Sequence, residues 1–188
     1  PTTRYEDLQG CDLVIEAVFE DRAIKAECTR KAEAVIAADA VFASNTSTLP
    51  ITGLAQVSSR PANFLGLHFF SPVDKMPLLE IIKGERTSDD ALSKALDLAK
   101  QIKKTPIVVN DARGFYTSRV IGFMVNEGMA MLAEGAPVED LERELPREVV
   151  AVLPARVGAA HAEDGQQGRG ITREADAPVH VVRPRQRA

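Results

Sequence analysis

A histidine and a carboxylate that could exchange a proton with a ligand stand in the middle of the chain. His68 follows one short apolar run, and Glu80 stands inside the next. A neutral imidazole at the end of a buried strand can act as a general base near pH 7, and a carboxylate bonded to one ring nitrogen fixes its tautomer. For a lone histidine, the competing interpretation has the advantage: a core side chain between Phe69 and Phe70. Glu80 alone could likewise be a buried ion-pair partner.

Two further groups of polar residues follow predicted strands. Asn45 and Ser47 lie in the run 44–48, and their amide and hydroxyl groups could hydrogen-bond a ligand hydroxyl or carboxamide. Spacing alone favours an ordinary turn that caps the following helix. Glu20 and Lys25 flank the start of a predicted helix, where Glu20 could bond a ribose and Lys25 could offer its charge to a phosphate. The alternative is a solvated helix N-terminus with ordinary dipole-matched charges.

Five apolar runs and three amphipathic segments must position these side chains. We expect strands at 12–18, 40–43, 63–67, 78–82 and 106–109, and helices at 22–37, 50–57 and 87–104. Asp21 can cap the first helix, and Thr87 with Asp90 resembles a capping box for the last. Strands that alternate with helices predict a doubly wound parallel α/β sheet. Ligands bind outside the carboxyl ends of such strands, and His68 stands at one of them.

The pattern changes after residue 110. A long, largely apolar segment from Gly114 to about Ala133 is followed by no strand, so we expect it to start a helical domain or an oligomer contact. Residues 145–188 contain no Lys, Phe, Tyr, Met, Ser or Asn. Such a composition cannot form a packed core, so we expect a disordered tail. Between a genuine tail and a segment translated out of frame from a GC-rich gene, the composition favours the second. The expected domains are 1–109, 110–144 and 145–188.

Composition and motifs exclude several classes of function. The chain has 188 residues and a formal net charge of −4, and the lack of a basic face argues against a nucleic-acid partner. No apolar run reaches the roughly 20 residues that a membrane-spanning helix needs. Cys11 and Cys28 have no framework spacing, which favours a reducing compartment and a cytoplasmic location. G-x-G-x-x-G, G-x-S-x-G and metal-ligand spacings are absent. Because the chain starts at Pro1, almost inside a strand pattern, we expect a truncated N-terminus.

Four blocks in register resemble the L-3-hydroxyacyl-CoA dehydrogenase family of fatty-acid β-oxidation. They are DLVIEAVFE (12–20), FASNTS (42–47), GLHFFSPV with the following LLE (66–80) and DARGF (111–115). The resemblance is to the dehydrogenase region of large multifunctional bacterial enzymes, and it covers about residues 1–144. It implies an incomplete Rossmann-like fold and the NAD-dependent oxidation of a 3-hydroxyacyl-CoA to the 3-ketoacyl-CoA.

The resemblance also implies roles by position. His68 resembles the general base, Glu80 its partner, and Ser47 the serine near the substrate hydroxyl and the nicotinamide. Cofactor-side or substrate-side contacts are implied for Glu20, Lys25, Asn45 and Ser71. Ser118, a catalytic candidate by position, and Ser71 both stand where family members carry asparagine. A serine lacks the paired donor and acceptor of an amide.

Partners and alternatives follow from the same resemblance. It implies a homo-oligomer, or a β-oxidation complex with thiolase, for the intact protein. The family's opening Gly-rich turn and most of its helical domain have no counterpart in the chain. A second hypothesis is therefore an inactive remnant, or a non-enzymatic binding or structural protein that reuses the fold. A third is another NAD-dependent dehydrogenase, against which the spacing of His68 and Glu80 argues.

Overall fold

The computed structural model describes residues 2–144 and 179–182, which fall into two compact units. Of the described residues, 2–115 and 179–182 belong to the first unit, and 116–144 belong to the second. The strands of the described residues all belong to the first unit, and the two described helices after residue 116 belong to the second. Within the described residues, no helix is long and apolar enough to cross a membrane.

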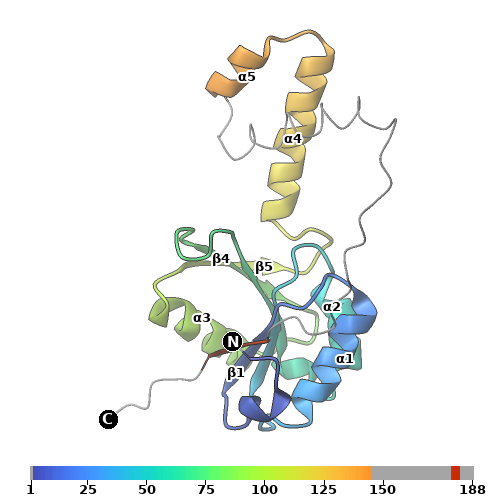
Figure 1. The fold of residues 1–188 in the computed structure, drawn as a ribbon, viewed down its shortest axis with the longest axis vertical. Helices are drawn as coiled ribbons and strands as arrows, with labels where there is room; N and C mark the ends of the chain where they lie inside the picture. The colour runs from blue at the N-terminus through green and yellow to red at the C-terminus, as the bar shows by residue number, and fades with distance from the viewer. Residues whose placement is uncertain (1, 145–178, 183–188) are drawn as a thin grey trace. The chain divides into compact units, whose positions relative to one another are not determined.

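A six-stranded sheet with the order β5-β4-β3-β2-β1-β6 forms the centre of the first unit (Figure 1). The strands are β1 (Leu13–Glu16), β2 (Val41–Ser44), β3 (Phe64–Phe69), β4 (Leu78–Lys83), β5 (Thr105–Asn110) and β6 (Val179–Val182). β1, β2 and β3 are parallel, as expected. The predicted parallel sheet is confirmed for most strand pairs, but β4 runs antiparallel to β3 and parallel to β5. Residues 70–77 are too few for a helical crossover, so the two strands form a hairpin.

β6 corrects a second expectation. It pairs antiparallel with β1, with Leu13 opposite Val182 and Glu16 opposite Val179. The composition of residues 145–188 led us to expect no strand there. The four residues Val179–Val182, three of them β-branched, nevertheless extend the open edge of the sheet at β1. The remainder of that segment, including the predicted reading-frame change, lies outside the described residues.

Helices cover both faces of the sheet, which confirms the α/β class (Figure 1). α1 (Arg22–Glu33) and α2 (Ile51–Leu54) lie on one face and α3 (Asp89–Gln101) on the other. Short 3-10 turns occur at Tyr5–Leu8, Ala55–Val57 and Pro61–Asn63. Alternate residues of each strand feed two separate apolar cores, so that Val14 packs beneath α1 whereas Ile15 packs toward α3.

The helix caps test the sequence prediction locally. The carboxylate of Asp21 accepts hydrogen bonds from the backbone amides of Ala23 and Ile24, as expected. α3 is capped instead by Ser88, whose hydroxyl accepts from the amide of Ala91 at 3.1 Å. The predicted box is therefore wrong by one residue, because the hydroxyl of Thr87 donates to the carbonyl of Phe64 and accepts from the amide of Gly84.

The second unit contains α4 (Thr117–Ala133) and α5 (Val138–Glu144). α4 begins three residues later than expected because Gly114 and Phe115 have φ angles of +75° and +48°, which a right-handed helix excludes. Gly135, with φ +94°, follows the end of α4. That these helices open a larger helical domain stays a prediction.

Candidate functional site

His68 and Glu80 are direct partners in the antiparallel β3–β4 pair. Side chains of directly opposed residues lie on the same face of a sheet, so the register brings the imidazole and the carboxylate together. Nδ1 of His68 lies 2.9 Å from Oε2 of Glu80. The hairpin thus gives a physical reason for the spacing of the two residues in the sequence. Both stand on the α1–α2 face, at the end of the sheet where β1, β2 and β3 terminate.

Aromatic rings enclose this pair. The His68 ring lies 4.5 Å from the Phe70 ring and 6.1 Å from the Phe115 ring, measured between centroids. Phe69 packs in the core on the opposite face of the sheet, as strand alternation requires. Of the two rings expected beside His68, Phe70 is therefore in contact with it and Phe69 is not. Glu80 is fully buried and His68 is 6% exposed. The pair is therefore packed like a core element although it stands at the edge of the sheet.

The two imidazole nitrogens of His68 have different surroundings. Its hydrogen bond to Glu80 uses Nδ1. Among the described residues, no buried side-chain nitrogen or oxygen lacks a hydrogen-bond partner. Nε2 is therefore the ring nitrogen that the hydrogen bond to Glu80 leaves for a ligand. A carboxylate bound at Nδ1 favours the tautomer with its proton there, which leaves a lone pair on Nε2 to accept a proton from a ligand.

Glu20 binds the loop that follows β2. Its Oε1 accepts hydrogen bonds from the Thr46 hydroxyl and from the backbone amides of Ser47 (3.1 Å) and Thr48 (3.3 Å). Burial raises the pKa of this carboxyl, but the Thr46 hydroxyl, the charge of Lys25 and the two amides together hold the pKa below its usual value. The Glu20 side chain, 37% exposed, therefore presents a stable anion at the carboxyl ends of β1 and β2.

Asn45 joins that loop to the His68 strand. Its side-chain oxygen accepts a hydrogen bond from the backbone amide of Phe69 at 3.0 Å, and its backbone amide donates to the carbonyl oxygen of Glu16 at 2.9 Å. The ends of three parallel strands are thereby linked. The structure thus brings Glu20, Asn45, Ser47 and His68 to one end of the sheet. Residues 44–48 do not cap the following helix, because the backbone amides of Ile51 and Thr52 donate to the Asp111 carboxylate instead.

Lys25 differs from both sequence interpretations. It is 2% exposed, so it is not part of a solvated helix end. Its Nζ lies 3.0 and 3.1 Å from the two carboxylate oxygens of Glu16, 3.2 Å from the Val18 carbonyl and 3.4 Å from Oε2 of Glu20. Glu16, which sequence reasoning missed, also accepts a hydrogen bond from Ser44. A glutamate that ends a run otherwise buried on both faces was the available signal.

The last two predicted residues are not brought to this edge by any described contact. Ser71 is exposed and precedes the cis Ser71–Pro72 bond in the loop between β3 and β4. Ser118 lies in the first turn of α4 and thus in the second unit.

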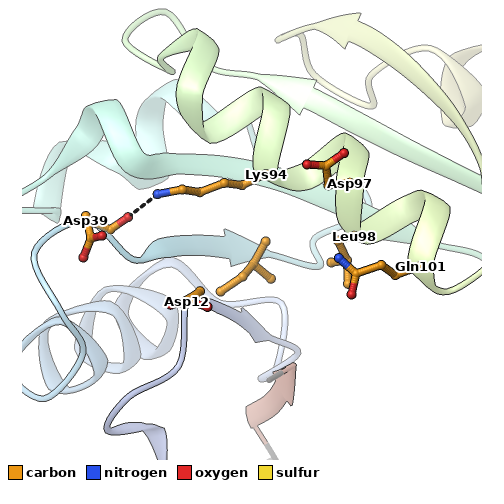
Figure 2. Close-up of a pocket in the computed structure, with 7 residues that line it drawn as sticks. Asp12, Asp39, Lys94, Asp97, Leu98 and Gln101 are labelled. Carbon is orange, nitrogen blue, oxygen red and sulfur yellow. Dashed lines mark hydrogen bonds between the residues drawn. The ribbon is translucent and has the colours of Figure 1, made fainter. Parts of the chain in front are cut away.

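A hollow of about 240 Å³ lies at the other edge of the sheet, beside the amino ends of β1 and β2 (Figure 2). It is lined by Asp12, Leu13, Asp39, Lys94, Asp97, Leu98 and Gln101. Nζ of Lys94 is 2.9 Å from the Asp39 carbonyl oxygen and 3.1 Å from an Asp90 carboxylate oxygen. The hollow contains none of the predicted site residues, and among the described residues no His, Cys, Asp and Glu side chains converge as metal ligands. The hollow therefore adds no residue to the candidate site around His68.

Comparison with known proteins agrees with this geometry. Residues 1–112 match the family described as "3-hydroxyacyl-CoA dehydrogenase, NAD binding domain". The chain is 46% identical over 144 residues to the fatty acid oxidation complex subunit alpha of Shewanella halifaxensis and 45% identical to that of Shewanella oneidensis. These matches cover 77% of the chain but 20% of each relative, so the chain spans about a fifth of their length.

Solved structures show the same fold. The (S)-3-hydroxybutyryl-CoA dehydrogenase of Ralstonia eutropha superposes with a TM-score of 0.69 at 40% identity, over 72% of this chain and 48% of that one. FadB2 of M. tuberculosis gives a TM-score of 0.69 at 35% identity, over 81% and 53%. The chain belongs to the 3-hydroxyacyl-CoA dehydrogenase family, and it carries the NAD-binding domain of that family.

Proposed function

We propose that the chain serves the NAD-dependent oxidation of an L-3-hydroxyacyl-CoA to the 3-ketoacyl-CoA in fatty-acid β-oxidation. The observation that carries the proposal is the His68–Glu80 pair, bonded at 2.9 Å and placed at the carboxyl edge of the sheet. In open α/β sheets this edge is where ligands bind. An alcohol can be oxidised there only if its hydroxyl proton has an acceptor, and Nε2 of His68 provides one.

His68 and Glu80 would share the work of proton removal. Nε2 of His68 accepts the proton of the C3 hydroxyl as the C–O bond becomes a carbonyl and the C3 hydrogen departs as hydride. Bound NAD supplies the hydride acceptor. Glu80 holds the Nδ1 proton, keeps the ring in the required tautomer and stabilises the imidazolium that forms. Because Glu80 is fully buried, the positive charge forms beside an existing anion rather than alone in the core.

The side chains at the ends of β1 and β2 fit the nicotinamide half of a dinucleotide. Glu20 is held as an anion, and an exposed carboxylate accepts hydrogen bonds from ribose hydroxyls. Asn45 and Ser47 lie on the adjoining loop, where their amide and hydroxyl groups suit a carboxamide or a substrate hydroxyl. Ser71 as a cofactor contact and Ser118 as a catalytic group are proposed from their positions in the sequence alone. Lys25, whose ammonium lies 3.4 Å from the Glu20 carboxylate, is proposed as a further contact of the cofactor.

Titration with NADH tests the cofactor part of the proposal. NADH fluorescence should rise saturably when the purified 188-residue chain is added, and Glu20→Gln should weaken the binding. The alternative is an inactive remnant or a non-enzymatic binding protein, and the absence of a G-x-G-x-x-G turn from the sequence favours it. If the chain proves folded by circular dichroism but gives no fluorescence change, the alternative replaces the proposal.

The proposal extends to the partners and the cellular location of the intact protein. The relatives are named as alpha subunits of a fatty acid oxidation complex. We infer that the intact protein works as a homo-oligomer or in a β-oxidation complex with a thiolase, in the cytoplasm. Co-purification of a native protein that contains this sequence, followed by mass spectrometry, would identify a thiolase partner or show that there is none.

A further inference from the structure

The turn that follows β5 holds a large side chain in an unusual backbone conformation. Gly114 and Phe115 have φ angles of +75° and +48°, so two consecutive residues lie in the left-handed region. Glycine adopts that region readily, whereas a phenylalanine rarely does. Such a conformation persists only where the surrounding structure determines it, and residues of this kind cluster at functional sites. The position of Phe115 therefore calls for an explanation beyond the reversal of the chain.

Hydrogen bonds tie this turn to the neighbouring elements. The two carboxylate oxygens of Asp111 accept from the backbone amides of Ile51 at 2.9 Å and Thr52 at 2.7 Å, in the first turn of α2. The amide of Gly114 donates to the carbonyl oxygen of Thr48 at 3.2 Å. The turn 111–115 is thus fixed near both of its ends, to α2 and to the loop that follows β2.

The Phe115 ring reaches the imidazole of His68. The two centroids lie 6.1 Å apart at an interplanar angle of 61°, which is within the range of edge-to-face aromatic pairs. Phe70 contacts the same imidazole at 4.5 Å and 50°. Phe115 is 2% exposed and belongs to the apolar core on the α1–α2 face. The left-handed turn therefore brings a core aromatic ring to the residue proposed as the proton acceptor.

A hydrogen bond at one nitrogen does not by itself fix the plane of an imidazole. The bond to Glu80 holds Nδ1 of His68, but the χ2 torsion of a histidine has broad minima. A ring that tilts about Nδ1 moves Nε2, the nitrogen that the substrate must meet. Aromatic rings packed against the imidazole restrict that tilt, because a close-packed interior leaves little space for it. Phe115 and Phe70 supply such rings.

We propose that Phe115 is a positioning residue that holds the His68 imidazole in the orientation in which Nε2 receives the proton of the substrate hydroxyl. Asp111 holds Phe115 in place by binding the first turn of α2. The inference rests on the proposed function, because the proton transfer is taken from it. His68 is the group that touches the substrate, and Phe115 acts only through it. The competing explanation is that Phe115 merely fills a volume in the core.

Two leucine substitutions separate the orientation of His68 from the filling of the core. Phe115→Leu keeps a buried apolar side chain at the turn but removes the ring from His68. Phe42→Leu is the matched control, because Phe42 is 1% exposed in the same core but has Phe64 as its aromatic partner, at 5.5 Å. Both variants should lower the urea midpoint by a similar amount, since each removes a similar apolar volume.

The ¹⁵N shifts of the His68 ring give a readout that the filling of the core would not change. These shifts report the tautomer, and they are assigned by the loss of signals in His68→Ala. We expect the wild-type chain to show one tautomer with its proton on Nδ1. In Phe115→Leu the two nitrogen shifts should move toward each other as the second tautomer becomes populated, whereas Phe42→Leu should leave them unchanged.

Turnover gives the second readout. Oxidation of 3-hydroxybutyryl-CoA by the full chain should fall about 10- to 100-fold in Phe115→Leu, the usual result of a misplaced reacting group, with KM within about twofold. Asp111→Asn should change the nitrogen shifts and turnover in the same direction by less. An amide has one oxygen where a carboxylate has two, so one of the α2 amides loses its acceptor. Because the Phe115 ring is retained, this variant decides the question if Phe115→Leu does not fold.

The possible results distinguish the positioning role from the proposed function. Unchanged His68 nitrogen shifts in Asp111→Asn, or in a folded Phe115→Leu, would refute the positioning role. Equal losses of turnover in Phe115→Leu and Phe42→Leu would refute it as well. A wild-type chain that does not oxidise 3-hydroxybutyryl-CoA would instead remove the proposed function, and the nitrogen shifts would still show whether Phe115 orients the imidazole.

Discussion

Two buried acid–base pairs stand on the same face of the sheet, and the difference between them lies in what reaches the surface. His68–Glu80 joins neighbouring strands, whereas Glu16–Lys25 joins the end of β1 to α1. The imidazole retains one ring nitrogen that the pair does not use. The ammonium is surrounded by protein acceptors. Charged partners are therefore suited to proton transfer in one pair and to joining a strand end to a helix in the other.

The two pairs also differ in their reliance on charge. A histidine can transfer a proton through one ring nitrogen while the other is bonded to a carboxylate. A buried lysine–glutamate pair has no such second nitrogen, and removing either partner leaves the other uncompensated. We therefore expect substitutions at the first pair to affect turnover and substitutions at the second to affect stability and cofactor affinity.

Replacing His68 should have the largest effect on activity. His68→Ala removes the proton acceptor, so turnover of 3-hydroxybutyryl-CoA should fall about 10³-fold, within the range that general acid–base catalysis contributes. NADH affinity should stay within about twofold, because Glu20 and the loop 46–48 are untouched. Initial rates of NADH formation and a fluorescence titration measure the two quantities. Turnover like that of the wild-type protein would remove His68 from the mechanism.

Replacing Lys25 should have the largest effect on stability. Lys25→Met leaves the Glu16 carboxylate, which is 1% exposed, without its cation. The free energy of unfolding should fall by about 3–5 kcal/mol, the usual result of breaking a buried pair on one side. Urea denaturation followed by circular dichroism gives the value. A loss below about 1 kcal/mol would mean that water reaches the pair, and the contrast between the two pairs would disappear.

The His68–Glu80 pair and the Glu16–Lys25 pair differ in how well the sequence predicts them. Apolar runs located all of β1 to β5 to within about two residues, and they placed His68 at a strand end. They did not reveal that β4 runs antiparallel to β3, because strand direction depends on the length of the connection and not on the strand residues. The contact between His68 and Glu80 was therefore expected from resemblance, whereas the register now supplies its physical cause.

The Glu16–Lys25 pair escaped prediction for a different reason. Hydrophobic periodicity identifies which residues of α1 face the sheet, but a lysine counts as polar in that pattern. The long aliphatic part of a lysine can nevertheless be buried when its ammonium group contacts an anion. Whether such an anion is within reach depends on how the helix packs against the sheet. The Ser88 cap was missed because Thr87 offers an equal local signal, and only its contact with Phe64 decides between them.

Replacing Glu80 should have an intermediate effect that compares the pairs directly. Glu80→Gln keeps a hydrogen-bond acceptor beside Nδ1 but removes the charge that stabilises an imidazolium. Turnover should fall about 10- to 100-fold, since a charge-assisted hydrogen bond is roughly twice as strong as a neutral one and operates here in a buried setting. Stability should change less than in Lys25→Met, because no unpaired charge remains. A greater loss of stability in Glu80→Gln than in Lys25→Met would reverse the assignment of the two pairs.

Glu20 provides the smallest and most specific effect, in the pH dependence of stability. Its pKa in the folded chain lies below the usual value because the Thr46 hydroxyl, Lys25 and the loop amides outweigh burial. A carboxyl with a lowered folded pKa contributes stability that is present above its unfolded pKa and is lost as the pH falls through its folded pKa. Glu20→Gln should therefore reduce stability at neutral pH and have progressively less effect as the pH falls below about 4.5, the ordinary value for a glutamate.

The size of that effect follows from exposure. The Glu20 side chain is 37% exposed, so solvent screening should limit the difference at neutral pH to about 1 kcal/mol or less. Urea midpoints for wild type and Glu20→Gln at several pH values measure it. Glu27→Gln is the reference for an exposed pair, because the hydrogen bond from Lys31 also lowers the pKa of Glu27, but on the exposed face of α1. If the Glu20→Gln difference grew at acid pH, burial rather than hydrogen bonding would dominate this carboxyl. Glu20 would then favour its protonated, neutral form, and the carboxylate that binds a ribose would have to come from another residue.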